Sequence, residues 1–411
     1  MNRQFLSRYR ERQRWEKTGP WKIVYGRRKV GKSFFVKNET GWDKYYFITH
    51  GGSVIDVGET KSMNTDEFYG EFFALLGKER IVVDEFQRLP RDFLDRIHAR
   101  GREGELTLIS SSLFAVKRIF GRGSPIIGLF DEIPFGLISP ADALWNMRDV
   151  ENAVETAAIV RDPWTYDGRT YDPARIAAKA GPHVGAIVAE IFAEEERTLT
   201  EIYRGALEAV AAGANTTGKI ASFLSGRRIA ENKPGILSGY ISVLRDLGII
   251  KRIRVHGVKN RYIIRHASPI FDLYYYMMDR YGYPDTDLPL TFIAKILERK
   301  MPGYVEDFVR ELLSEYYGLP EGVWMKAGEE IDIALGWKGV QVIGEVKWTE
   351  KVDRKTVRKI ENKMARFENA EKVLIVKRPE NVAETDIKVI GPEDLIKIAE
   401  DVVKRRRGQG V

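Results

Sequence analysis

The segment Gly26–Ser33 carries the pattern with the most specific chemistry in this chain. It has the spacing G-x-x-x-x-G-K-S of a phosphate-binding loop, or P-loop. Its glycines let backbone N–H groups face a phosphate, and the helix expected to follow adds partial positive charge at its N-terminus. Lys32 would reach the β- and γ-phosphates, and the Ser33 hydroxyl would ligate Mg²⁺. The residues expected to bind the nucleotide are Gly26, Arg27, Arg28, Lys29, Val30, Gly31, Lys32, Ser33 and Phe34.

A P-loop also predicts a second motif, an apolar strand that ends in an acid. The β-branched run 81–83 leads directly into Asp84 and Glu85. In open α/β sheets, ligands gather at the carboxyl ends of the parallel strands. Asp84 would hold Mg²⁺ through water. Glu85 would polarise the attacking water, as in ATPases of the additional-strand class.

Two further features could contact the γ-phosphate. A third apolar strand, 106–109, ends in Ser110-Ser111-Ser112. One of these serines could contact the γ-phosphate or the water, although a hydroxyl-rich turn between a strand and a helix would look the same. Arg122 follows in Phe-Gly-Arg-Gly and could act as a catalytic arginine finger, with an ordinary surface arginine as the alternative.

The C-terminal part carries a second acidic pattern, D-x₁₂-E-x-K. Asp332 and Glu345 are expected on adjacent strands, with Lys347 on the same face as Glu345. Two carboxylates and the carbonyl of the intervening residue can hold Mg²⁺, and the lysine can position or deprotonate the attacking water. Glu306, on a predicted helix upstream, could add a further acid. Strand-borne acids next to a lysine also occur as ordinary surface ladders.

These motifs require several domains to position them. A chain of 411 residues is too long to fold around a single hydrophobic core. We expect an α/β multidomain protein with a P-loop ATPase core at 1–139, a helical lid at 140–199, a winged helix-turn-helix at 200–285 and a nuclease-like α/β domain at 286–411.

With no cysteine, the chain has no disulfide framework. Because Lys, Asp or Gly interrupts the longest apolar runs, we expect no membrane span and a cytoplasmic location.

The winged helix-turn-helix rests on three predicted helices, 201–212, 217–224 and 236–247, followed by a hairpin. Such a unit binds DNA or serves as a domain-packing arm, and both alternatives stay open. The run 271–278 reads as a buried helix. Basic residues that could contact phosphates lie on the hairpin: Lys251, Arg252, Arg254, Lys259 and Arg261.

Positive charge is concentrated near the N-terminus. The chain has 66 Lys and Arg against 59 Asp and Glu, a net charge of +7. Residues 1–33 hold eleven basic residues and only Glu11 and Glu16, a local balance of +9. A second basic run, 404–407, closes the chain. Clustered positive charge favours a polyanionic partner, nucleotide or nucleic acid, although a solvated basic surface would also explain the C-terminal run.

Four segments together resemble the archaeal STAND-related P-loop ATPase family. They are Phe5-Leu6-Ser7-Arg8, the P-loop with its preceding tyrosine, Val83-Asp84-Glu85-Phe86-Gln87, and Phe120-Gly121-Arg122. The resemblance implies ATP as the nucleotide and an Asp84 strand next to the P-loop strand. It also implies a C-terminal restriction-endonuclease-like domain of the PD-(D/E)XK type.

Two functions of different classes follow. The first is an ATP-binding and ATP-hydrolysing protein that couples nucleotide state to DNA binding and Mg²⁺-dependent DNA cleavage. In this hypothesis Glu85, Lys32, Arg122 and Lys347 are catalytic, and the metal ligands are Ser33, Asp84, Asp332, Glu345 and Glu306. The alternative is a nucleotide-switched DNA-binding or assembly scaffold with a non-catalytic nuclease-like domain. Both allow nucleotide-dependent self-association.

Overall fold

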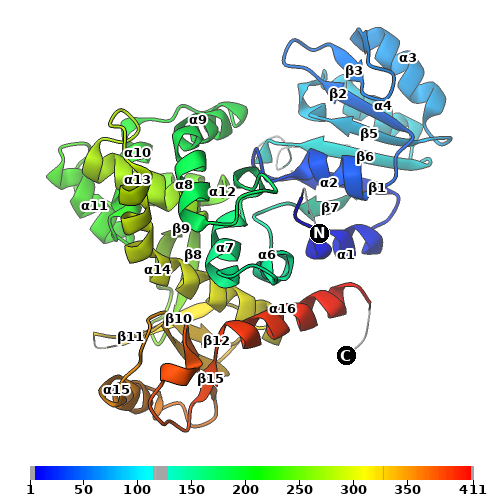
Figure 1. Ribbon diagram of the computed structural model, residues 1–411. Coiled ribbons are helices and arrows are strands. Elements are labelled where there is room, and N and C mark those ends of the chain that lie inside the picture. The colour runs from blue at the N-terminus through cyan, green and yellow to red at the C-terminus, as the bar shows by residue number, and fades with distance from the viewer. Residues whose placement is uncertain (1–4, 114–115, 117–127, 327, 409–411) are drawn as a thin grey trace. The chain divides into compact units, whose positions relative to one another are not determined.

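The computed structural model describes residues 5–113, 116, 128–326 and 328–408 (Figure 1). The chain divides into two compact units. The P-loop unit comprises Arg10–Gly136 and Ala186–Thr198. The large unit comprises Met1–Tyr9, Leu137–Gly185 and Leu199–Val411.

The P-loop unit alternates strands and helices, which is the pattern of an α/β fold. Its helices are α1 (Tyr9–Lys17), α2 (Lys32–Glu39), α3 (Thr65–Leu75), the short η1 (Phe86–Arg88) and α4 (Asp92–Arg100). Its strands are β1 (Trp21–Tyr25), β2 (Lys44–Ile48), β3 (Val54–Asp56), β4 (Lys61–Met63), β5 (Arg80–Asp84), β6 (Glu105–Ser110) and β7 (Asp131–Pro134).

These strands form one seven-stranded sheet in the order β4-β3-β2-β5-β6-β1-β7. Strands β2, β5, β6, β1 and β7 are mutually parallel, and β3 and β4 add an antiparallel edge. Strand β6 lies between the P-loop strand β1 and the Asp84 strand β5. The expectation that these two strands are neighbours is therefore wrong.

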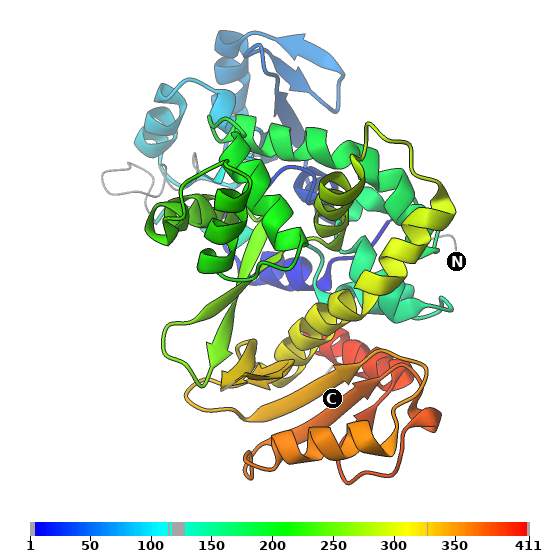
Figure 2. The same ribbon diagram turned by 90° about the vertical axis from the view of Figure 1, so that its left-hand side faces the viewer.

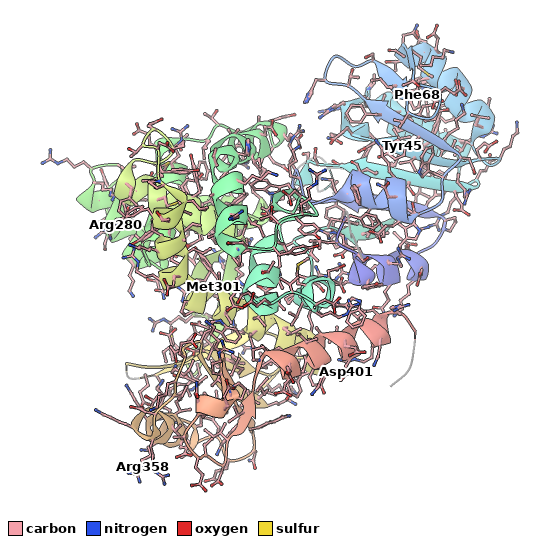
Figure 3. The ribbon with its side chains drawn as sticks, viewed as in Figure 1. Tyr45, Phe68, Arg280, Met301, Arg358 and Asp401 are labelled. Atoms are coloured by element: carbon pink, nitrogen blue, oxygen red, sulfur yellow. The ribbon has the colours of Figure 1, made fainter. Side chains whose placement is uncertain are left out.

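Both faces of this sheet are buried, as expected for parallel strands covered by helices. On one face the alternate residues Ile81 and Val83 pack with a cluster that includes Phe68 of α3. On the other face Val82 packs with a cluster that includes Phe35 of α2 and Tyr45. Figure 3 labels Phe68 and Tyr45, one from each cluster. Alternate residues of each strand are buried on opposite faces of the sheet, and therefore almost every position of these strands is apolar.

Helices dominate the first half of the large unit. They are α6 (Pro140–Met147), α7 (Ala153–Val160), η2 (Pro163–Thr165), α8 (Pro173–Ala180), η3 (Gly181–His183) and α9 (Val184–Glu194), whose later residues belong to the P-loop unit. The 22-residue stretch Pro173–Glu194 is long and apolar enough to cross a membrane by length and composition, and half of its apolar window is buried. A partly buried helix of a globular core meets the same criterion.

Three helices and a hairpin follow, close to the predicted bounds. They are α10 (Glu201–Ala211), α11 (Thr217–Gly226), α12 (Pro234–Asp246), β8 (Ile250–His256) and β9 (Tyr262–His266). The largely buried helix α13 (Pro269–Tyr281) confirms the reading of 271–278 as a buried helix. Next comes α14 (Leu290–Tyr317), a single helix of 28 residues.

The strand expected to carry Asp332 is in fact two short strands in different sheets, one on either side of this residue. Strand β11 (Glu329–Ile331) pairs with β10 (Gly322–Lys326), and β10 pairs in parallel with β8, which gives a sheet β11-β10-β8-β9. Strand β12 (Ile333–Leu335) belongs to another sheet, β12-β13-β14-β15. Asp332 is the residue at which the chain changes sheets. Sequence periodicity cannot detect this switch, because the alternation of apolar residues continues unbroken through Ile331, Ile333 and Leu335.

The C-terminal sheet contains β13 (Val342–Lys347), β14 (Glu371–Val376) and β15 (Lys388–Ile390), which are parallel to one another. Helix α15 (Arg354–Met364) packs on it through Val357, Ile360 and Met364. The short η4 (Pro379–Asn381) precedes β15, and α16 (Pro392–Arg406) ends the fold and packs against α14 and α6. Figure 2 shows this sheet in orange with α14 in yellow above it.

Candidate functional site

The loop 26–31 turns sharply from β1 into α2. Gly31 has φ +90°, in the left-handed region that glycine adopts without a steric penalty. Lys29 is also left-handed, with φ +66°. A Cβ at Gly26 would lie 2.1 Å from the carbonyl oxygen of Phe135, so only glycine fits there. The spacing of the two glycines is therefore imposed by the backbone path.

Lys32 lies at the centre of this loop with its ammonium group buried. Its Nζ donates hydrogen bonds to the carbonyl oxygens of Gly26 at 2.8 Å and Arg27 at 3.0 Å. Burial lowers the pKa of Lys32 to about 8, against the opposing effect of the nearby Glu85 and Asp84 carboxylates. A phosphate at this position would supply the negative charge that the buried ammonium needs.

Asp84 provides a buried carboxylate with capacity for a cation. Its Oδ2 accepts a 2.6 Å hydrogen bond from the Tyr45 hydroxyl, and its Oδ1 is buried without a hydrogen-bond partner. Burial raises the pKa of Asp84, while hydrogen bonds from Tyr45 and Ser33 oppose this effect. An unpaired carboxylate oxygen beside the Ser33 hydroxyl fits Mg²⁺, which prefers oxygen ligands. Nothing in the sequence pattern indicated Tyr45, because its approach depends on the register of β2 against β5.

Glu85 follows β5 in a left-handed conformation, with φ +59°, which is uncommon for a non-glycine residue. Its Oε2 accepts hydrogen bonds from Ser111 Oγ at 2.7 Å and from Gln87 Nε2 at 2.5 Å. The strained backbone and the two donors fix the carboxylate at the carboxyl edge of the sheet. Of the three serines, Ser111 is the one that contacts Glu85, whereas Ser110 bonds within its own turn.

An acidic segment of α9 meets the cations around this site, and sequence analysis did not identify it. Arg28 forms ion pairs with Glu190 at 2.6 Å and Glu194 at 2.5 Å. Glu194 also lies 3.8 Å from Arg88 and acts electrostatically on Lys32. Carboxylates therefore occupy the position from which Arg28 could meet a phosphate. Glu195 accepts a 2.5 Å hydrogen bond from the backbone N–H of the residue after Ser112.

The remaining predicted residues of the nucleotide site have varied surroundings. Arg27 is buried and donates to the Arg28 carbonyl at 3.3 Å. Val30 is fully buried in the core, and Phe34 is exposed. Arg122 lies outside the described residues.

The second acidic site forms where β12 meets β13. Since Ile333 pairs with Gly344 in this antiparallel ladder, Asp332 lies opposite Glu345. Lys347 Nζ lies 3.1 Å from Glu345 Oε1 and 3.9 Å from Asp332 Oδ2. Lys363 of α15 is a second cation, 2.7 Å from the same Glu345 oxygen. The structure thus brings together the predicted aspartate, glutamate and lysine.

Electrostatics distinguish the acids of this site. Burial and the neighbouring Glu345 raise the pKa of Asp332 to about 6. Burial and Asp332 raise the pKa of Glu306 to about 8, so Glu306 is largely protonated at neutral pH. Glu345 Oε2 is buried without a hydrogen-bond partner. This orphan oxygen, the Asp332 carboxylate and the Val346 carbonyl fit a hard cation, whereas no group of three or more His, Asp or Glu placed to hold a metal occurs among the described residues.

The basic residues do not share one role. Burial opposes the charge of Lys251, but Asp307 and Glu311 outweigh that effect and raise its pKa, so this lysine is internal. Arg254, Lys259 and Arg261 are exposed on the hairpin. In the C-terminal run, Arg406 is bound to Asp142 at 2.8 Å and Glu315 at 3.1 Å. That arginine therefore has a structural role.

Neither a protein-family model nor a curated protein matches the chain. Several solved structures resemble it at low identity. The Walker-type ATPase PABY2304 of Pyrococcus abyssi is 17% identical, with a TM-score of 0.44, over 65% of this chain and 94% of that chain. Cdc6p from Pyrobaculum aerophilum is 12% identical, with a TM-score of 0.25, over 68% and 88%. The Aeropyrum pernix ORC2 protein is 12% identical, with a TM-score of 0.34, over 69% and 88%.

Proposed function

We propose that this protein binds and hydrolyses ATP at the P-loop. The observation that carries the proposal is the convergence of Lys32, Asp84 and Glu85 at one edge of a parallel sheet. Each of the three is buried, and a buried charged group is stable only when a partner compensates it. A phosphate chain with its metal ion would compensate all three groups at once.

Four residues of the site would have different roles in hydrolysis: Lys32, Ser33, Asp84 and Glu85. Lys32 would exchange its two carbonyl acceptors, Gly26 and Arg27, for phosphate oxygens. Ser33 and Asp84 would hold Mg²⁺, which offsets the charge that develops on the transferred phosphoryl group. Glu85 would accept a hydrogen bond from the attacking water, with Ser111 fixing the carboxylate in place.

Paired binding and hydrolysis assays test this proposal. Lys32→Ala should lose ATP binding, and Glu85→Gln should keep binding but lose turnover. Gln87→Ala, which removes one donor to Glu85 but no charge, is the matched control with a smaller effect. Hydrolysis that persists in Glu85→Gln would overturn the role of Glu85 as the residue that activates water.

We further propose that nucleotide state controls DNA binding and DNA cleavage by the large unit. The arrangement of α10, α11, α12 and the β8–β9 hairpin supports a winged helix-turn-helix. The opposition of Asp332 and Glu345, with Lys347 beside both, supports a nuclease of the PD-(D/E)XK type. Mg²⁺ at this site would polarise the scissile phosphate, and Lys347 would position the water.

A specific contact favours the alternative, a nucleotide-switched scaffold without nuclease activity. Both Lys347 and Lys363 pair with Glu345 Oε1, so two ammonium groups already compensate the carboxylate that a metal would use. Incubation of supercoiled, linear, single-stranded and branched DNA with Mg²⁺, with and without ATP, separates the two functions. Cleavage that is lost in Glu345→Ala supports the nuclease. An ATP-dependent change in DNA binding without cleavage supports the scaffold.

A further inference from the structure

Trp337 is the most exposed large apolar side chain among the described residues, at 67%. It lies in the turn that joins β12 to β13. The backbone of this turn is bonded on both sides of the tryptophan. The N–H of Gly336 donates to the carbonyl oxygen of Pro320 at 3.3 Å, and the N–H of Gln341 donates to that of Leu335 at 2.8 Å. The turn is therefore anchored while it presents an indole ring to solvent.

Arg254 connects this turn to the β8–β9 hairpin. Its Nη1 donates a 3.3 Å hydrogen bond to the carbonyl oxygen of Trp337. Figure 2 shows the hairpin, in light green, reaching toward the orange C-terminal sheet. On the other side of β8, Arg254 is directly opposite Tyr262 of β9, and opposite residues of an antiparallel pair project from the same face. Tyr262 is 46% exposed. Two exposed aromatic residues thus lie on either side of one arginine.

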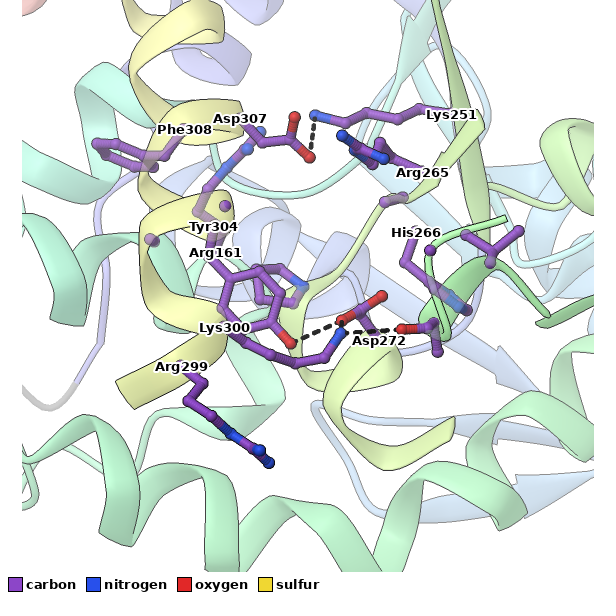
Figure 4. A pocket seen from close by; sticks show the side chains of 17 residues that line it. Arg161, Lys251, Arg265, His266, Asp272, Arg299, Lys300, Tyr304, Asp307 and Phe308 are labelled. Atoms are coloured by element: carbon purple, nitrogen blue, oxygen red, sulfur yellow. Dashed lines mark hydrogen bonds and ion pairs between the residues drawn. The ribbon is translucent and has the colours of Figure 1, made fainter. Parts of the chain in front are cut away.

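The chain around these rings is basic. The segments 250–266 and 333–344 hold seven Lys and Arg and no Asp or Glu. Two of the seven face the interior. Lys251 pairs with Asp307 at 3.8 Å, and Figure 4 shows Arg265 beside this pair in the wall of a cavity of about 240 Å³. These two cations are compensated inside the large unit and are not part of the exposed surface.

Four of the other cations are exposed: Arg254, Lys259, Arg261 and Lys338. None of them forms an ion pair with a carboxylate in the part of the chain that the structure describes. Positive charge without acidic neighbours favours a partner with repeated negative charges.

The aromatic rings restrict the choice of that partner. An acidic peptide would pair with the cations but would leave the rings of Trp337 and Tyr262 without a planar group to stack on. Nucleic acid supplies both phosphates and planar bases. In a duplex the base faces are covered by neighbouring base pairs, whereas in a single strand they can stack on aromatic side chains. The combination of exposed rings and unpaired cations therefore selects a single strand.

We propose that this surface, named here the stacking surface, binds single-stranded DNA. The bases stack on Trp337 and Tyr262, and the phosphates contact the four exposed cations. The inference deepens the DNA binding proposed for the large unit and rests on it, since it names the form of DNA that this unit takes. Trp337 is five residues from Asp332, which is at most about 17 Å of chain. A strand on the stacking surface would therefore extend close to the second acidic site.

Fluorescence anisotropy with labelled DNA tests the proposal, in the absence of divalent metal so that no strand is cut. The probes are an oligothymidylate of about 20 nucleotides and a blunt duplex of the same length. Trp337→Ala should weaken binding of the single strand about fivefold or more, because each stacked base contributes to affinity, and should change duplex binding about twofold or less. Trp337→Phe keeps a ring and should retain most of the affinity. Phe292→Ala, which removes an exposed ring at the start of α14, is the matched control and should have no effect.

Salt dependence separates the cations from the rings. Lys338→Gln should weaken binding of the single strand and reduce the slope of log affinity against log salt by about 0.7, because one phosphate contact is lost. Trp337→Ala should leave this slope unchanged. Arg280→Gln removes an exposed charge of α13 outside the stacking surface and should change neither the affinity nor the slope.

Two results would overturn the stacking surface. One is equal binding of the single strand by the wild-type protein and Trp337→Ala. The other is a poly-glutamate peptide of similar length that binds as tightly as the oligothymidylate, which would show a site for any polyanion. If the duplex still binds in either case, the DNA binding proposed for the large unit stands. Conversely, binding of the single strand that depends on Trp337 but not on ATP would support the stacking surface and reject the nucleotide control.

Discussion

Ser111 at the end of β6 donates a 2.7 Å hydrogen bond to Glu85 at the end of β5. The two residues meet because β5 and β6 are adjacent parallel strands whose carboxyl ends lie at the same edge. Removing the negative charge of Glu85 should therefore reduce catalysis more than removing the hydroxyl group of Ser111. We expect Glu85→Gln to reduce kcat for ATP about a hundredfold or more, and Ser111→Ala to reduce it by about tenfold or less. Steady-state hydrolysis at saturating ATP measures both, and a larger loss in Ser111→Ala would contradict the assignment.

Nucleotide affinity should depend on pH through Lys32. Its pKa is lowered to about 8 by burial, and only the protonated form attracts phosphate. As pH rises from about 7 to about 9, the protonated fraction falls about tenfold, so the dissociation constant for ATP should rise by about that factor. Fluorescent-nucleotide titrations at both pH values measure the change. Lys32→Ala should show no measurable ATP binding at either pH, and a flat wild-type profile would contradict the prediction.

Glu194 should oppose nucleotide binding. It pairs with Arg28 at 2.5 Å and acts electrostatically on Lys32. Glu194→Gln would remove one of the two carboxylates that pair with Arg28, and with it a negative charge that acts on Lys32. ATP should therefore bind several-fold more tightly, which corresponds to about 1 kcal/mol. Glu190→Gln is the control, because Glu190 pairs with the same arginine but is half exposed and so more screened. Weaker binding in Glu194→Gln would show that this carboxylate supports the site.

Metal binding at the second acidic site should strengthen as pH rises through about 6. The pKa of Asp332 is raised to about that value by burial and by Glu345, and only the ionised carboxylate binds a cation. Mn²⁺ titrations from about pH 5 to about pH 7 should therefore show about tenfold tighter binding at the higher pH. Glu345→Gln should abolish the site, and retention of Mn²⁺ in that variant would place the metal elsewhere.

Arg310 should be essential to the stability of the large unit. It is fully buried, pairs with Asp307, lies 3.4 Å from Glu306 and donates to the Asp332 carbonyl at 3.3 Å. Arg310→Met would leave buried carboxylates without compensation and should cost about 3–5 kcal/mol. Urea unfolding followed by circular dichroism measures this loss. Arg280→Met, at an exposed position, should change the stability by about 0.5 kcal/mol or less, and equal losses in the two variants would contradict the internal role of Arg310.

Local patterns predicted the elements that carry the chemistry. The β-branched run before Asp84 and the glycine spacing before Lys32 are short-range signals, because strand propensity and phosphate-loop geometry depend on neighbouring residues. The helices α10 to α12 and the β8–β9 hairpin also lie close to their predicted bounds. Each has its own apolar periodicity, which tertiary contacts did not override.

These local patterns could not predict the order of the strands in the sheets or which strands pair. Nothing in the residues of β6 says that it inserts between β1 and β5, and the family resemblance implied the opposite. The switch of sheets at Asp332 was hidden for the same reason, since the apolar residues Ile331, Ile333 and Leu335 alternate as they would in one continuous strand. Hydrogen bonding between strands is set by contacts that are distant in sequence, whereas periodicity reports only which face of a strand is buried.

The sequence by itself therefore determined which residues could bind phosphate and metal, because those roles depend on side-chain type and local spacing. Only the tertiary structure decided the partners of these residues: Tyr45 with Asp84, Ser111 with Glu85, and Glu194 with Arg28. It also lined one cavity of the large unit with residues from six elements that are distant in the chain. Long-range packing brings these groups within a few ångströms, and at such distances in a buried environment electrostatic interactions are strong enough to determine the chemistry.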